Sequence, residues 1–478
     1  MELVTSFFGM KGIQVMTHSD QHGVEIKAAG PDAVGSYDRA VTEYLRIGNS
    51  TLKFLEAALE TDPDLVMAHC ATGYFQAFNT RWGVAGGMHA SLKEAERALE
   101  TRGGTPSELL HVAALRALSR GNLNETVRVW EEILVEQPRD VLALRLAHSY
   151  YFILGDQLNL RDSISRTLYA WDESVPNYGY VLGAYAFGLQ ETGDYLAGEA
   201  TAKRAVELKP DDLYGAHAAT HVHDMQTRYR EGKEWVKACE NNWRDCNSFL
   251  NHEWWHYTLF CVELEQYDEC LAYLDSHVFV EGSEEFRDTS SICSVLWRLD
   301  DLGIDVGDRW QSLADIAERH IDDHILAYAD IFTTLALTAG GREEAAQRML
   351  ASMRGIKIDD DVTTTRIIHE IGLPIAEALI AYRAGDYGRV VDLLMPIRYD
   401  TRRMGYSHVQ RDIFALTLMH AAVKSGRYEL ARALLSERTA LKPNSTISWN
   451  LYARALEGLG DKTGTEKARA QVQAVLAA

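Results

Sequence analysis

Histidines gather in one stretch of this chain, between residues 213 and 256. Two pairs have members four residues apart: His217 with His221, and His252 with His256. On a helix, residues i and i+4 lie on one face about 6 Å apart, so each pair could bind one metal ion through its imidazoles. With Asp224, these residues could form a site of three histidines and one carboxylate for a divalent ion such as zinc, or a dinuclear site.

The same residues support other interpretations, which the sequence leaves open. One histidine could act as general base, or a bound divalent metal could activate water, in hydrolysis or a related proton-transfer reaction. The catalytic residues would then be His217, His221, Asp224, His252 and His256. They could instead bind a ligand without metal. In the simplest interpretation, buried imidazoles bridge packed helices by hydrogen bonds through both ring nitrogens.

Residues 252–256 read HEWWH, which matches the HExxH pattern of zinc proteases. That pattern is short and arises by chance. No third ligand is placed downstream as in those proteases, and the segment lies within a helical repeat. We therefore interpret the match as a coincidence.

The elements that must position these residues are paired helices. Amphipathic segments end at Pro63, Pro138, Pro210 and Pro443, because proline cannot continue a helix. The clearest unit runs from residue 179 to 212, with a turn at Gly193 and small residues where the paired helices must approach closely. This unit resembles the 34-residue tetratricopeptide pattern. Such units bury their apolar faces only by stacking, so the sequence predicts one continuous solenoid.

The repeat register predicts which side chains face the concave groove. In tetratricopeptide repeats, positions 2, 5, 9 and 12 of the first helix line that groove. Repeats that begin at Leu213 and Asn251 place the following residues there: Tyr214, His217, His221, Asp224, His252 and Trp255. His256 lies one turn further, while His223 and Trp254 are predicted to pack inward.

Further groove positions in other repeats add candidate ligand-binding residues. Arg145, Asp330 and His420 occupy them in repeats that begin at residues 141, 326 and 412. Trp255 and Tyr214 complete this set, since an aromatic ring can stack on an aromatic or cationic ligand. If the solenoid curls enough to bring its C-terminal repeats over residues 217–256, these side chains would close a pocket.

Several stretches give the chain a family resemblance. The chain resembles the tetratricopeptide-repeat protein 38 family in these segments: HAATHVHDM at 217–225, NHEWWHYTLF at 251–260, LALRLAHSYYFILG at 142–155 and QRDIFALTLMHAA at 410–422. The resemblance spans roughly residues 35 to 450 and implies a helical-repeat fold without an established activity. In that family the second motif reads His-Asn-x-x-His, so Glu253 stands where the family has asparagine.

Composition limits the classes of partner and compartment. The chain has 478 residues, with 69 acidic and 48 basic side chains and a formal charge of −21. This excess argues against nucleic-acid binding through a basic surface. The chain has six cysteines and no CxxC pair, and its N-terminus shows no secretory signal, so we expect free thiols in the cytoplasm. No apolar run is long enough to span a membrane, so we expect no membrane contact.

The predicted organisation is all-α, a tetratricopeptide-like solenoid that a strong curl would close into a superhelix. Residues 1–35 are expected to be irregular, with a hairpin within 12–27, and residues 36–478 to form one repeat domain whose helices start near Asp38. Segments 279–309 and 356–366 interrupt the repeating pattern of helix pairs.

This organisation predicts a module that binds a peptide or protein segment in its concave groove. The alternative is a hydrolase-like enzyme or small-molecule receptor that uses the histidines, with homo-oligomerisation left open. The groove positions hold His, Tyr, Asp and Trp rather than a clamp of Lys, Asn and Arg. Capture of acidic C-terminal peptides is therefore not expected.

Overall fold

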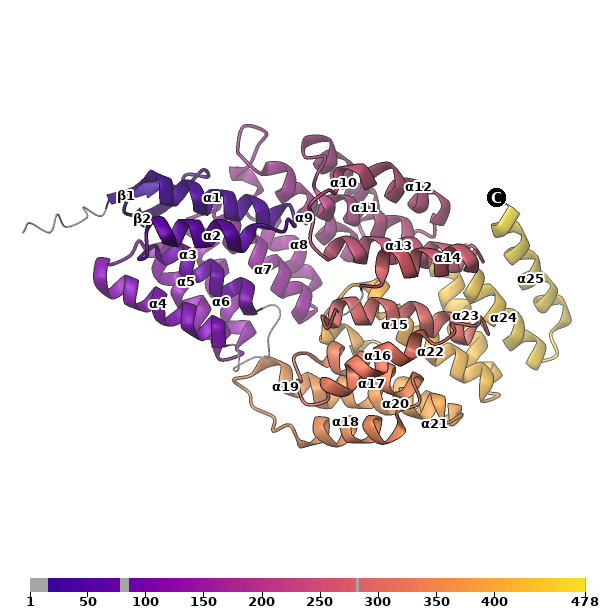
Figure 1. Cartoon of the computed structure of the whole chain (residues 1–478). Coiled ribbons are helices and arrows are strands. Elements are labelled where there is room, and N and C mark those ends of the chain that lie inside the picture. Colours follow the sequence, from indigo (N-terminus) through magenta and orange to yellow (C-terminus); the bar gives the residue numbers. More distant parts are fainter. Residues whose placement is uncertain (1–15, 78–85, 281–282, 478) are drawn as a thin grey trace, which may run out of the picture.

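The computed structural model describes residues 16–77, 86–280 and 283–477, which form an almost entirely helical chain (Figure 1). The helices of the first half are α1 (Pro31–Leu45), α2 (Thr51–Thr61), α3 (Val66–Ala77), α4 (Gly86–Arg102), α5 (Pro106–Ser119), α6 (Leu123–Glu136), α7 (Val141–Leu154), α8 (Gln157–Ser165), α9 (Tyr178–Glu191), α10 (Tyr195–Leu208), α11 (Leu213–Met225) and α12 (Tyr229–Cys239). Successive helices pack against each other in antiparallel pairs, which confirms the tetratricopeptide-like solenoid.

The second half continues the same arrangement. Its helices are α13 (Phe249–Glu263), α14 (Tyr267–Tyr273), α15 (Phe286–Asp301), α16 (Arg309–Arg319), α17 (Ala327–Ala339), α18 (Glu343–Gly355), α19 (Thr363–Ile367), α20 (Leu373–Arg383), α21 (Tyr387–Leu394), α22 (His408–Lys424), α23 (Tyr428–Leu441), α24 (Thr446–Gly458) and α25 (Lys462–Ala477). Segment 279–309 is less irregular than predicted, because α15 occupies most of it. The buried stripe of α15 includes three serines, which weaken its apolar period in the sequence.

A short hairpin precedes the helices. Strands β1 (Met16–Ser19) and β2 (Glu25–Ala28) pair antiparallel, with Met16 opposite Ala28. Helix α1 starts at Pro31, several residues before the predicted start near Asp38. Proline at the first helical position costs no hydrogen bond, and Asp32 in the first turn favours the helix N-terminus.

The repeat from residue 179 shows how the sequence forms one helix pair. Gly193 takes a left-handed conformation, with φ of 87°, between α9 and α10. The Asp194 side chain then caps α10 by accepting a hydrogen bond from the backbone of Ala197. A Cβ at Gly188 would lie 2.6 Å from the Cα of Arg161, so this glycine permits the close approach of α8 and α9.

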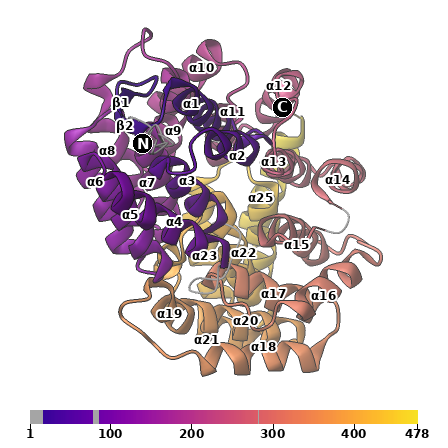
Figure 2. The ribbon, with the colours of Figure 1, turned by 60° about the vertical axis from the view of Figure 1, so that its left-hand side comes forward.

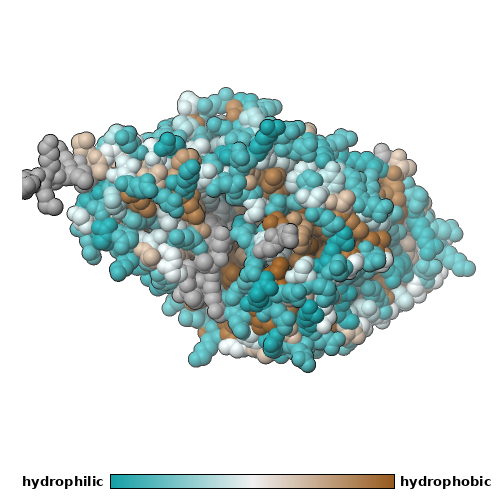
Figure 3. Space-filling model, viewed as in Figure 1, coloured by the Kyte–Doolittle hydropathy of each residue, from teal (hydrophilic) through white to brown (hydrophobic). Residues whose placement is uncertain are grey.

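The solenoid curls until its C-terminal repeats cover its middle. The backbone N–H of Tyr406 donates to the Phe152 carbonyl. Helix α22 contacts α11 and also packs against α15, beside which it lies in Figure 2. On the face shown in Figure 3 the surface is mainly hydrophilic, with hydrophobic side chains gathered in its hollowed middle. The helix that α22 contacts, α11, carries His217 and His221.

Buried charges join the two halves. Lys442 Nζ lies 3.0 Å from Asp224 Oδ1, and Arg438 contacts both carboxylate oxygens of Asp412 at 2.7 and 2.8 Å. Burial by itself would raise the pKa of Asp412, but Arg438 and Lys442 hold it well below its ordinary value. This network links α11 to α22 and α23, and each charged group in it faces one of opposite sign.

Two predictions made from composition can be compared with the described residues. None of the described helices has the length and apolarity required to cross a membrane. All six cysteines lie in the described part and are free thiols.

Asp212, the N-cap of α11, should make stability depend on pH. Burial raises its pKa to about 7, whereas an unfolded aspartate titrates near 3.9. The folded protein therefore holds a proton that the unfolded chain releases, and the free energy of unfolding falls as pH rises from about 4 to about 7, by at most about 1.4 kcal/mol per unit. Asn keeps the cap without titrating, so D212N is expected to flatten this slope in urea unfolding.

The matched control is D194N, which alters an exposed N-cap of the same kind on α10. D194N should keep the wild-type slope. An equal slope in D212N and the wild type would contradict the assignment of the proton to Asp212.

Candidate functional site

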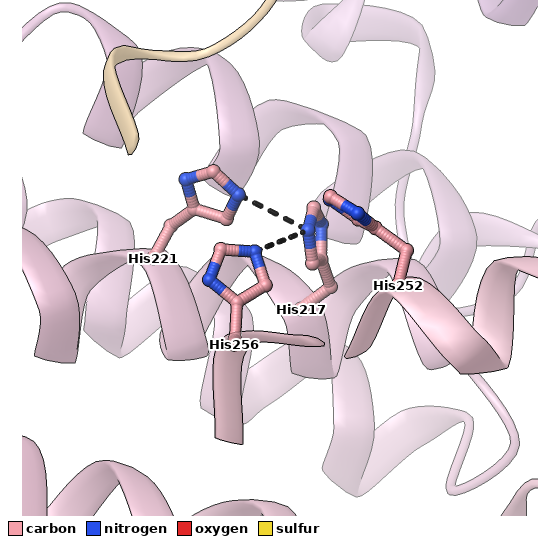
Figure 4. Close-up of side chains that lie close together, drawn as sticks. All are labelled: His217, His221, His252 and His256. Atoms are coloured by element: carbon pink, nitrogen blue, oxygen red, sulfur yellow. Dashed lines mark hydrogen bonds between the residues drawn. The ribbon is translucent and has the colours of Figure 1, made fainter. Parts of the chain in front are cut away.

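The four histidines converge at the contact between α11 and α13 (Figure 4). Helix α11 supplies His217 and His221, and α13 supplies His252 and His256. One ligand atom from each lies within 4.8 Å of the others. His217 is central, since its Nε2 is 3.0 Å from Nε2 of His221 and 3.1 Å from Nε2 of His256. The i, i+4 spacing on both helices thus brings the predicted residues together.

Hydrogen bonding alone does not account for these two contacts. If the Nε2 of His217 carries a proton, it can donate to only one of its two neighbours. If it carries a lone pair, that single lone pair faces two donors. Tetrahedral zinc with Zn–N bonds of about 2.0–2.1 Å requires N···N separations of about 3.3 Å, close to those found here. The two Nε2 contacts of His217 are therefore a little shorter than the separation expected between ligands of one ion.

The far sides of these rings are also unsatisfied by the protein. Within the described part of the chain, Nδ1 of His217, His221 and His256 is buried without a hydrogen-bond partner. Burial, together with the neighbouring imidazoles, holds the pKa of all three well below its ordinary value. They are therefore neutral at physiological pH, which is the state that binds metal.

His252 occupies a different position in the cluster. Its Nδ1 lies 3.4 Å from Ser291 Oγ on α15, and its ring stacks on Trp255 with centroids 4.8 Å apart. It is partly exposed, whereas the other three are buried. Burial, with a contribution from Arg287, lowers the pKa of His252 to about 3. His252 is thus the one member at the edge of the cluster.

An apolar wall surrounds the cluster. The Phe187 ring stacks on His217 with centroids 5.5 Å apart and meets His221 edge-on at 5.0 Å. Phe249 covers another edge of His217 at 4.9 Å. Such a dry shell strengthens metal–ligand bonds and excludes competing solvent. The sequence pattern did not indicate either ring, although Phe187 lies on α9, the first helix of the repeat before α11.

Glu191 is a buried carboxylate that the sequence reasoning also missed. Its Oε1 lies 3.8 Å from His221 Nδ1, the nitrogen that points away from the cluster centre. It accepts a hydrogen bond from Gln190 Nε2 at 2.9 Å, and the His408 backbone N–H points to it from α22. Glu191 is the last residue of α9, which is otherwise mainly apolar. A single carboxylate at the end of such a helix is the sequence signal that could have identified it.

Tyr214 and Arg145 lie beside the cluster but belong to a separate contact. The Tyr214 hydroxyl is 3.0 Å from Nε2 of His148, whose Nδ1 donates to the Leu160 carbonyl. This tautomer makes Nε2 the acceptor and Tyr214 the donor. The Arg145 guanidinium lies 3.8 Å from the centre of the Tyr214 ring. Both predicted ligand-binding side chains are buried and already bonded, so neither faces an open groove.

Two other predicted residues, Asp224 and Trp255, are placed differently from the prediction. Asp224 forms the ion pair with Lys442 and does not reach the histidines, so the cluster has no carboxylate ligand from it. Trp255 is 1% exposed and donates its indole N–H to Ser294 Oγ at 2.7 Å. It supports His252 and offers no exposed surface for stacking. The repeat register could not foresee that Lys442 from the C-terminal repeats and Ser294 from α15 contact these two side chains.

Glu253 faces away from the imidazoles. It accepts a hydrogen bond from Thr220 Oγ1 at 2.5 Å, and burial raises its pKa to about 8. It is therefore protonated at neutral pH and lies apart from the four-histidine group. This geometry agrees with the interpretation of the HExxH match as a coincidence.

Asp330 and His420 lie outside the cluster. Asp330 accepts from Nδ1 of His324 at 3.0 Å, and His420 Nδ1 is 4.0 Å from Asp301. They come from repeats that curl past the histidines to other parts of the core. The solenoid therefore does not combine all predicted groove residues in one pocket.

Comparisons with known proteins add distant likenesses only. No protein-family model matches the chain. The chain is similar to the yeast Tom70 structure, with 13% identity, a TM-score of 0.35, and coverage of 92% of this chain and 96% of that one. It is also similar to the P58(IPK) TPR domain, with 11% identity, a TM-score of 0.22, and coverage of 77% and 99%. Similarities this distant carry no argument about function.

Proposed function

We propose that this chain is a metal-binding helical-repeat protein that holds one divalent transition-metal ion in its core. His217, His221 and His256 would supply Nε2 ligands, and His252 would be the fourth. The observation that carries the proposal is the pair of Nε2···Nε2 contacts at 3.0 and 3.1 Å around His217. Two such contacts to one nitrogen cannot both be good hydrogen bonds, whereas one ion can bind all three lone pairs.

The ligand set favours a particular class of metal. Neutral imidazoles suit zinc, copper, nickel and iron, while magnesium and calcium prefer oxygen ligands. Zinc is the first choice because it takes four nitrogen ligands in a tetrahedron and four histidines are in reach. Proximity of the Glu191 carboxylate would offset part of the charge of a buried divalent ion.

The enzyme alternative is favoured by one feature, the edge position of His252. If His252 yields its place to water, three histidines and one open position would match the ligand count of catalytic zinc sites, and the bound water would be activated for hydrolysis. The peptide-binding role predicted from the repeat pattern is the second candidate, and the contact of α22 with α11 narrows the part of the concave face that a peptide could use.

Calorimetric titration of the full-length protein, purified without a histidine tag and treated with chelator, tests the proposal. We expect one equivalent of zinc to bind tightly and magnesium to give no signal. H221A and H256A should each weaken zinc binding strongly, while the control H89A, at an exposed position on α4, should not. Zinc binding that is absent, or unchanged in H221A and H256A, would overturn the proposal.

Glu191 should increase the metal affinity of this site by acting on His221. At 3.8 Å, Glu191 Oε1 is not hydrogen-bonded to the outer nitrogen of His221 in this structure. If the carboxylate moves to accept from that nitrogen when metal binds, it would fix the tautomer and raise the basicity of the imidazole, and loss of such a partner costs about 10–100-fold in metal affinity. We therefore expect E191Q to weaken zinc binding by about this factor in competition titrations with a chelating dye.

The control for this prediction is E207Q, which removes an exposed carboxylate on α10. It should bind zinc like the wild type. Wild-type affinity in a folded E191Q protein would show that Glu191 does not orient His221.

A further inference from the structure

One edge of the histidine cluster is less buried than the rest. His221 is 0% exposed, whereas His252, at one side of the group in Figure 4, is partly exposed. Phe249 is also partly exposed, and its ring centroid lies 5.5 Å from that of His252 and 5.8 Å from that of Tyr214. Arg145 lies over the Tyr214 ring, and both side chains are 9% exposed. We call these four side chains the accessible edge: Arg145, Tyr214, Phe249 and His252.

Arg145 brings a positive charge to the accessible edge without an anionic partner. Its guanidinium carbon lies 3.8 Å from the centre of the Tyr214 ring, so the cation–π contact uses one face of the group. Its N–H donors lie at the rim of the guanidinium plane. Among the residues that the structure describes, no carboxylate oxygen lies within 4.0 Å of these donors. Asp212 interacts with the Arg145 charge from further away, and burial raises the pKa of that carboxyl to about 7. The donors of Arg145 are therefore available to an added anion.

Two more buried arginines come from helices packed around the cluster. Arg298 lies on α15, which packs on α13, and donates to the Ser294 carbonyl at 2.8 Å. Arg411 lies on α22, which contacts α11, and donates to the Gly405 carbonyl at 2.8 Å. In the described part of the chain, neither guanidinium has a carboxylate oxygen within 4.0 Å. A buried charge costs free energy unless it is paired, and a divalent ion at the histidines would add to this positive excess. A bound anion would offset it.

We propose that the accessible edge binds a small carboxylate, an inference that rests on the metal site proposed above. The planar donor fork of Arg145 matches the two oxygens of a carboxylate, and zinc accepts carboxylate oxygen as well as imidazole nitrogen. The anion would therefore interact with both positive charges. A phosphate dianion fits less well, because one guanidinium beside the rings of Tyr214 and Phe249 cannot replace the hydration of its oxygens.

Titration of the cobalt-loaded, full-length protein tests this inference, because the visible absorption of cobalt(II) changes when its ligands change. The probes are acetate and its neutral isostere acetamide. We expect acetate to bind at least about 10-fold more tightly than acetamide, since contacts between charged groups are the stronger ones. R145M should lose this preference. R145K keeps the charge without the planar fork, so it should retain only part of the preference.

The matched control is R39M. Arg39 also lies over an aromatic ring, 5.4 Å from the centre of Phe54, and no carboxylate oxygen of the described chain lies within 4.0 Å of its guanidinium. It is exposed on α1, so R39M should bind acetate like the wild type. The zinc affinity of R145M should equal or exceed that of the wild type, because a positive charge near the ion is removed.

No binding of acetate to the cobalt-loaded wild type, equal binding of acetamide, or an unchanged acetate preference in R145M would overturn the inference. If R145M also loses zinc, R145K decides, and an acetate preference equal to that of the wild type would contradict the role of Arg145. Inorganic phosphate is a further probe, and tighter binding of phosphate than of acetate would overturn the assignment to a carboxylate. A protein that binds neither zinc nor cobalt would overturn the proposed function as well, whereas zinc binding without acetate binding overturns this inference alone.

Discussion

Replacing His217 with alanine is expected to abolish zinc binding at neutral pH. His217 is the only member of the cluster whose Nε2 contacts two other imidazole nitrogens in the described structure, at 3.0 and 3.1 Å. Its loss removes one ligand and also the ring that holds the other two in place. Since loss of an outer-shell partner already costs about 10–100-fold in metal affinity, loss of this ligand should cost more than about 100-fold. Competition titration with a chelating dye measures the change.

A second histidine variant separates ligation from packing. His223 is buried on the same helix but lies beside Trp235 and Glu199, away from the cluster. H223A should lower stability yet keep wild-type zinc affinity. If H217A retains tight zinc binding, or if both variants lose it equally, the assignment of ligands is wrong.

Replacing Lys442 with methionine is expected to destabilise the fold by about 3–5 kcal/mol, because it leaves a buried carboxylate without its partner. Lys442 lies 3.0 Å from Asp224, and both side chains are buried where α23 ends against α11. Methionine fills a similar volume, so the main effect is the uncompensated charge of Asp224. Urea unfolding of the metal-free protein measures the change in the free energy of unfolding.

The control for this variant is K467M, at an exposed position on α25, which should change stability by less than about 0.5 kcal/mol. The double variant K442M/D224L removes both charges, and replacement of a buried ion pair by apolar residues is often neutral. The double variant should therefore recover much of the free energy of unfolding that K442M loses. A K442M protein as stable as the wild type would show that the charges do not close the solenoid.

The helix pairs were predictable because their signals are local. Each of the prolines 63, 138, 210 and 443 lies two residues after the end of a helix, and Gly193 lies in the turn between α9 and α10. The i, i+4 histidine pairs depend on the same local periodicity, so their shared face followed from the register. Helix α15 was missed because Ser290, Ser291 and Ser294 interrupt its apolar stripe, and tertiary packing overrides that weak pattern.

The features that the sequence did not predict depend on contacts between residues that are far apart in the chain. Lys442 and Asp224 are 218 positions apart in sequence, and nothing local connects them. Without that contact, Asp224 appeared free to bind metal and Trp255 appeared to face an open groove. Glu191 was missed for the same reason, since its role arises only where the end of α9 meets His221 and the start of α22.

Zinc K-edge X-ray absorption of the tag-free protein, loaded with one equivalent of zinc, tests the central claim most directly. We predict four nitrogen or oxygen neighbours at about 2.0–2.1 Å, with the outer-shell scattering of at least three imidazole rings and no sulfur. The same spectrum from H217A should lose that imidazole signature. A shell of oxygen alone, a sulfur ligand at about 2.3 Å, or an unchanged spectrum in H217A would contradict a histidine-bound ion in the core.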